Sequence, residues 1–108
     1  AMATDIVVIL CTAAPSDAAS MAQALVEQRL AACVNIVPVH SIYRWKGKIC
    51  NDPEHLMIVK TSKEAADLAV TAIRSLHSAE VPEIIELPVI SGYAPYLDWV
   101  WQETKCTR

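Results

Sequence analysis

Cysteine and histidine are the side chains in this sequence best suited to chemistry, and the chain has four of the first and three of the second. Cys11 ends an apolar run that predicts a strand, and His77 follows a segment with helical spacing. A thiolate together with an imidazole suits copper or zinc, because both metals accept soft or borderline donors. Two ligands are too few for a closed zinc site, which takes four. A buried thiol and a histidine that only ends a helix are the alternative interpretation.

Cysteine catalysis is the enzymatic hypothesis that these residue types raise. Cys33 would be the nucleophile, with His40 or His77 as its base. A reactive thiol needs an exposed, electropositive setting, whereas Cys33 follows the apolar stretch Leu30–Ala32. The sequence offers no Ser-His-Asp arrangement and no carboxylates clearly paired for acid–base work. We therefore expect that the protein is not an enzyme.

A second group of metal-ligand residue types lies in the middle of the chain: Cys50, Asp52, Glu54 and His55. Asn51-Asp52-Pro53 is a turn signal, and the spacing matches no metal motif. A solvated turn is therefore the favoured interpretation of this group.

Glycine content and charge exclude several classes of ligand. The only glycines are Gly47 and Gly92, too few for the three-glycine dinucleotide fingerprint, and no P-loop is present, so no nucleotide or organic cofactor is expected. Nine Lys and Arg residues stand against twelve Asp and Glu, a net charge of -3 that disfavours nucleic acid and anionic membranes. The small basic strip of Arg44, Lys46 and Lys48 fits a solvated sheet edge better than an RNA site.

The apolar content points to association between subunits. Hydrophobic residues make up 54% of 108 residues, and a domain of this size buries only about 60–70% of its unfolded surface. The longest apolar run, Ile6–Cys11, is far too short to span a bilayer, and Asp5 before it argues against a signal peptide. We expect a single domain over residues 1–108, a cytoplasmic location, and an Ala1 that was added ahead of a native start at Met2.

Hydrophobic periodicity predicts the order β-α-β-β-α-β followed by a C-terminal helix. The first half is expected to contain a strand over 6–10, a helix over 18–30, a strand over 34–45 and a hairpin at 46–48. A returning strand follows, which is interrupted at 51–53 and resumes over 55–60. The second helix is expected to run from a capping box at Thr61 and Glu64 to about 76, and a strand over 83–90 and a helix over 96–103 complete the chain. This is the ferredoxin-like α+β pattern, with both long helices on one face of an antiparallel sheet. The other face needs the terminal helix or neighbouring subunits to cover it.

Several spaced motifs resemble the CutA family of divalent-cation tolerance proteins. They are Leu30-Ala31-Ala32-Cys33-Val34-Asn35, Ser41-x-Tyr43-x-Trp45-x-Gly47-Lys48, Glu54-x5-Lys60-Thr61, His77-x-x-Glu80-Val81-Pro82-Glu83 and Tyr96-Leu97-x-Trp99. The resemblance runs from about Val7 to Trp101. It implies a homotrimer similar in fold to the PII signal proteins, linked to tolerance of copper and other divalent metals.

The resemblance also implies which residues form sites. It carries a soft-metal site, for copper or a similar divalent ion, onto Cys11 and His77, and it places a small-ligand cleft between subunits. Alternation along the strand puts Tyr43 and Trp45 on one side and Arg44, Lys46 and Lys48 on the other. The residues expected to line the cleft are Tyr43, Trp45, Lys60 and Glu83. An inter-subunit core with Lys60 as an ion-pair partner is the alternative.

One departure from the family pattern follows His77. Ser78 and Ala79 stand where the family usually has Pro-Tyr, so a tyrosine is missing from the expected cleft. The functional prediction is a metal-binding trimer with a small ligand at its subunit interfaces. The alternative is a structural trimer that anchors or assembles a partner protein.

Overall fold

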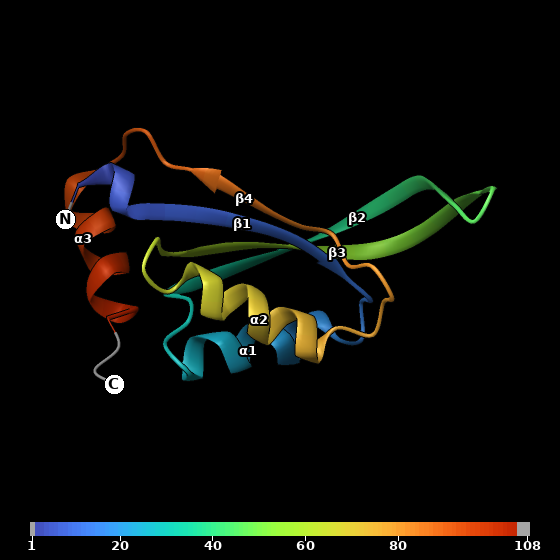
Figure 1. Cartoon of the computed structure of the whole chain (residues 1–108), viewed down its shortest axis with the longest axis horizontal. Helices are drawn as coiled ribbons and strands as arrows, with labels where there is room; N and C mark the ends of the chain where they lie inside the picture. Colours follow the sequence, from blue (N-terminus) through green and yellow to red (C-terminus); the bar gives the residue numbers. More distant parts are fainter. Residues whose placement is uncertain (1, 106–108) are drawn as a thin grey trace.

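The computed structural model describes residues 2–105, and it contains the predicted βαββαβ order followed by a third helix (Figure 1). Ala1, predicted to be an addition ahead of Met2, and the fourth cysteine, Cys106, lie outside the described residues. The elements are η1 Ala3–Asp5, β1 Ile6–Ala13, α1 Ala18–Glu27, β2 Cys33–Trp45, β3 Lys48–Ser62, α2 Ala66–Leu76, β4 Ile84–Pro88 and α3 Ala94–Glu103.

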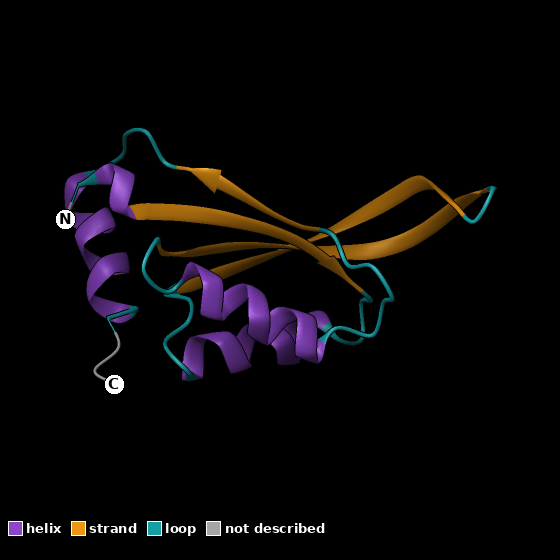
Figure 2. Cartoon of the chain, viewed as in Figure 1, coloured by secondary structure: helices purple, strands orange, loops and turns teal. Residues whose placement is uncertain are grey.

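The four strands form one antiparallel sheet in the order β2-β3-β1-β4, and α1 and α2 both lie against one of its faces (Figure 2). Alternate residues of β1, such as Ile9 and Cys11, are buried against these helices together with Met57 and Val59 of β3. Alanines on the helices, among them Ala69, let the backbones approach the sheet closely. The ferredoxin-like α+β prediction is confirmed.

The returning strand is longer than predicted, because no turn interrupts it at 51–53. β3 runs unbroken from Lys48 to Ser62 and pairs with β2 along the whole length of that strand. Pro53 is tolerated because β1 ends at Ala13, opposite His55, so Pro53 has no neighbour on its β1 side. The interpretation of Cys50, Asp52, Glu54 and His55 as a turn was therefore wrong, because all four lie within β3.

Thr61 does not cap α2, contrary to the prediction of a capping box with Glu64. It lies inside β3, where it is fully buried and its hydroxyl donates a hydrogen bond of 2.7 Å to the carbonyl of Leu30. Pairing with β1 continues as far as Ser62, whose Oγ accepts a hydrogen bond from the amide of Ala65 at 3.2 Å. The helix begins only after that turn, at Ala66.

The hairpin between β2 and β3 lies at the predicted place, 46–48, and its turn has two central residues. Trp45 pairs with Lys48, while Lys46 and Gly47 occupy the turn with φ of 49° and 78°. Positive φ at both central residues is typical of a type I′ turn, which matches the twist of the flanking strands. The hairpin extends beyond the helices as an arm of the sheet (Figure 1).

The terminal helix does not cover the second face of the sheet, contrary to one of the two expected arrangements. Leu97 and Val100 of α3 pack against Ile6 at the end of the sheet near the N-terminus. Within residues 2–105, no helix lies on the face opposite α1 and α2 (Figure 2). Ile85 and Leu87 of β4 are exposed by 47% and 41%, which leaves an apolar surface on this face.

Candidate functional site

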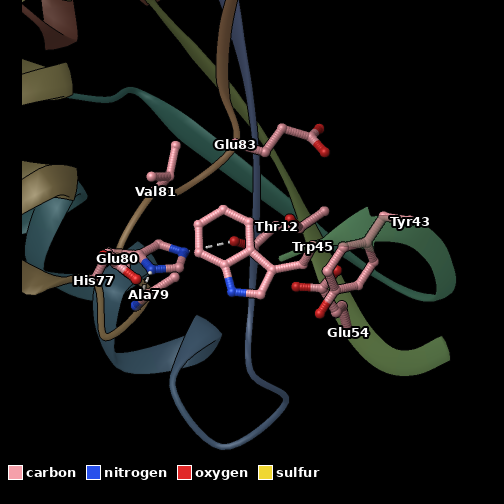
Figure 3. Close-up of a pocket in the computed structure, with 9 residues that line it drawn as sticks. All are labelled: Thr12, Tyr43, Trp45, Glu54, His77, Ala79, Glu80, Val81 and Glu83. Carbon is pink, nitrogen blue, oxygen red and sulfur yellow. Dashed lines mark hydrogen bonds between the residues drawn. The ribbon is translucent and has the colours of Figure 1, made fainter. Parts of the chain in front are cut away.

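A pocket of about 340 Å³ lies where the end of β1, the β2–β3 arm and the loop between α2 and β4 meet (Figure 3). Because the loop crosses beside the arm, residues distant in the sequence share one cavity. The lining residues are Thr12, Tyr43, Trp45, Glu54, His77, Ala79, Glu80, Val81 and Glu83. Tyr43, Trp45 and Glu83 of the predicted cleft, and His77 of the predicted metal pair, are therefore brought together.

His77 is held by two hydrogen bonds, one at each ring nitrogen. It ends α2 with extended backbone angles, and its Nδ1 accepts a hydrogen bond of 3.0 Å from the amide of Ala79. Since Nδ1 accepts, the proton of the neutral ring is on Nε2, which donates to the carbonyl oxygen of Thr12 at 2.7 Å. The backbone amide of Ala79 thus fixes the orientation of the imidazole.

The thiol of Cys11 contacts the same carbonyl oxygen. Its Sγ donates a weak hydrogen bond of 3.6 Å to the oxygen of Thr12, so both predicted metal ligands converge on one oxygen atom. Cys11 is completely buried, and burial, followed by the charges of Glu83 and Glu54, raises the pKa of the thiol to about 11. The thiol is therefore protonated at neutral pH.

Carboxylates dominate the charge of the pocket. Glu54, Glu80 and Glu83 all line it, and no lysine or arginine is among the lining residues. Lys46 reaches the rim from the hairpin turn, where its Nζ lies 3.5 Å from a carboxylate oxygen of Glu80 and 5.7 Å from the centre of the Trp45 ring. The pocket therefore favours positively charged ligands.

Tyr43 is oriented by a carboxylate on the neighbouring strand. Its hydroxyl donates a hydrogen bond of 2.7 Å to Asp52, and this bond is the main reason why the pKa of the phenol rises to about 12. In Figure 3 the indole of Trp45 lies between Tyr43 and His77. Two aromatic rings thus contribute to one wall of the pocket.

Lys60 is not in this pocket, although the sequence grouped it with Tyr43, Trp45 and Glu83. It pairs with Val8 and Cys33, whereas Tyr43 pairs with Cys50. Ten residues of continuous strand separate positions 50 and 60, which corresponds to about 33 Å. The Nζ of Lys60 instead donates to Cys33 Sγ at 3.7 Å. The unbroken length of β3 is the reason for the separation.

The basic strip also differs from its predicted place. Arg44 faces away from Trp45 as expected, but Lys48 is the cross-strand partner of Trp45 and shares its face. Lys46 lies in the turn and contacts the Trp45 ring instead of opposing it. A tight turn breaks the two-residue alternation on which the prediction relied.

Sequence reasoning missed Thr12, Glu54 and Glu80 as members of the site. Register could have found Glu54, because it shares a strand face with Asp52, the hydrogen-bond partner of Tyr43. Thr12 contributes its main-chain carbonyl, which no side-chain motif reveals. Among residues 2–105 there is no group of three or more His, Cys, Asp and Glu side chains arranged to hold a metal ion. No helix in this range is long and apolar enough to cross a membrane.

Comparison with known proteins identifies relatives along almost the whole chain. The family model described as CutA1 divalent ion tolerance protein matches residues 6–103. A Divalent-cation tolerance protein CutA from Thermus thermophilus is 46% identical over 99 residues, which are 91% of this chain and 96% of the relative. Protein CutA of Mus musculus is 51% identical over 89 residues, or 82% of this chain, but these span only 50% of the mouse protein.

Solved structures of relatives have the same fold. The Thermus thermophilus structure matches with a TM-score of 0.88 and 45% identity, covering 93% of this chain and 99% of that one. A structure of the PII-like protein CutA from a Nostoc species matches with a TM-score of 0.89 and 35% identity, covering 92% and 97%. The chain belongs to the family of CutA1 divalent ion tolerance proteins.

Proposed function

We propose that this protein is a cytoplasmic, non-catalytic homotrimer that binds copper or a similar divalent metal ion and takes a small ligand in the pocket beside His77. The observation that carries the metal proposal is the convergence of Cys11 Sγ and His77 Nε2 on the carbonyl of Thr12. A sulfur and an imidazole nitrogen on one oxygen form a donor set that suits copper or zinc. The charges of Glu83 and Glu54 act on the Cys11 thiol and favour a cation near it.

Metal binding at this pair requires an exchange of bonds. The thiol of Cys11 has to lose its proton, and Nε2 of His77 has to replace its hydrogen bond to Thr12 with a bond to the metal. The hydrogen bond from the Ala79 amide to Nδ1 opposes this exchange, because it places the proton of the neutral ring on Nε2. The fold thus holds the two donors together, and the affinity for the metal depends on pH because the Cys11 thiol has to lose its proton.

The apolar face opposite α1 and α2 supports the trimer. Val37, Ile85 and Leu87 are each exposed by more than 40% on this side of the sheet. A second copy of the same chain would remove these side chains from water, which stabilises the assembly by about 25 cal/mol per Å² of apolar surface buried. The family relationship supports the same arrangement.

Native mass spectrometry of the purified protein with and without Cu²⁺ tests the proposal, because it reports subunit number and metal count together. We expect three protomers and a defined number of copper ions that falls when Cys11→Ala and His77→Ala are combined. The matched control is Cys50→Ala, which removes a partly exposed thiol elsewhere. An unchanged copper count in the double variant would refute this ligand assignment, and a monomer would refute the assembly.

A structural trimer that anchors a partner protein is the second candidate. Ile90 and Tyr93, in the segment that leads into α3, are exposed by 85% and 76%, and such apolar side chains are typical of contact surfaces. Affinity capture with wild type and with Ile90→Ser/Tyr93→Ser separates the two functions. Loss of a defined partner from a variant that still binds copper would favour the structural role.

A further inference from the structure

We propose that the pocket recognises a small organic cation that carries an ammonium group, an inference that rests on the proposed role of the pocket as a ligand site. Its charge is the first reason. Glu54, Glu80 and Glu83 line the cavity and no lysine or arginine does, so the charge of the lining disfavours an anionic ligand. Metal ions do not need a cavity of about 340 Å³, which is instead the size of a small-molecule site.

The aromatic wall is the second reason. Trp45 and Tyr43 lie on one strand face and both line the cavity. The face of an indole ring attracts ammonium groups through its electron-rich π system, and tryptophan is the strongest of the aromatic residues in this respect. Carboxylates combined with an indole face provide both charge and an apolar surface for an alkylammonium ion.

Lys46 shows how an ammonium group is accommodated at the rim. Its Nζ lies 5.7 Å from the centre of the Trp45 ring and 3.5 Å from Glu80. Lys46 holds this position from a turn residue with φ of 49°, where asparagine and glycine are the usual residues. Lys46 and Glu80 are each exposed by 69%, so this ion pair is weak and a ligand can displace it. Lys46 therefore acts as an internal competitor for the ligand.

The test is calorimetric titration of the 108-residue protein with 1,4-diaminobutane, with 1,4-butanediol as a neutral compound of similar shape. We expect the diamine to bind and the diol to give no heat above dilution. Glu83→Gln should weaken diamine binding about tenfold, since it removes a charge from the lining. Trp45→Leu should weaken it about threefold to fivefold through loss of the ring face. Thermal unfolding of each variant checks that it is folded.

Lys46→Ala and Arg44→Ala form the matched pair that isolates the competitor. Both remove one positive charge from the same arm, but Arg44 faces away from Trp45. We expect Lys46→Ala to tighten diamine binding about threefold to tenfold and Arg44→Ala to leave it nearly unchanged. Equal effects of the two variants would refute the role of Lys46. Equal binding of diol and diamine, or no binding of either, would overturn the inference.

Cys11→Ala separates this inference from the metal proposal. The variant should lose copper affinity and retain the diamine, because the thiol is fully buried and is not among the residues that line the pocket. Copper binding by wild type without diamine binding would refute the organic-cation inference alone. Diamine binding by wild type without copper binding would refute the metal proposal alone.

Discussion

The thiol of Cys11 should make the protein less stable at alkaline pH by a predictable amount. Cys11 is completely buried between Met57 and Ile84 on the neighbouring strands, and its pKa rises from an ordinary value of 9.0 to about 11, chiefly through burial. Between these two values the unfolded chain loses the proton while the folded protein keeps it. The free energy of unfolding should therefore fall by about 1.4 kcal/mol per pH unit across this window. The free energy of unfolding falls by about 3 kcal/mol in total across this window. Well below pH 9 the thiol is protonated in both states, so Cys11 gives no pH dependence there.

Urea unfolding of wild type and Cys11→Ala, from about pH 7 to about pH 11 at one protomer concentration, measures this effect. Lysines and tyrosines also titrate in this range, but their contributions cancel in the difference between the two proteins. Loss of the sulfur gives an offset that does not depend on pH. The stability of wild type relative to the variant should therefore decline from pH 9 upward. Two curves that stay parallel would refute the conclusion that the folded protein keeps this thiol protonated.

Three further predictions concern the hairpin, the strand that precedes α2 and the rim of the pocket. Gly47→Ala should lower the free energy of unfolding in urea by about 1 kcal/mol, because the residue has a φ of 78° and an added Cβ would meet no other atom. Gly47→Asn should lower it less, and equal unfolding free energies of the two variants would contradict this. Thr61→Val should lower the free energy of unfolding by about 1–3 kcal/mol, because it removes the buried hydrogen bond to Leu30. Thr61→Ser retains the donor, so equal losses of the two variants in urea unfolding would assign the effect to packing. Asp52→Asn should lower the pKa of Tyr43 from about 12, as followed by phenolate absorbance against a Tyr43→Phe reference, and an unchanged titration would exclude the carboxylate as its cause.

Local pattern was sufficient for most of the fold. Alternation and helical spacing depend only on near neighbours, so the βαββαβ order and the additional helix were predictable. The hairpin turn was predictable at Gly47, because few residues adopt positive φ. The prediction of a turn at Pro53 failed because a strand tolerates proline where one of its edges has no neighbouring strand. The sequence does not show where the neighbouring strand ends.

The candidate site depended on both the sequence and the tertiary structure. The sequence by itself determined which residue types were available, and the family resemblance selected the site residues Cys11, His77, Tyr43, Trp45, Lys60 and Glu83. Only the tertiary structure decided which of them meet. Strand pairing and the return of the chain after α2 bring His77 to a carbonyl 65 residues away, while the unbroken β3 carries Lys60 out of reach. Such contacts depend on register and on the path of the backbone, which side-chain spacing does not encode.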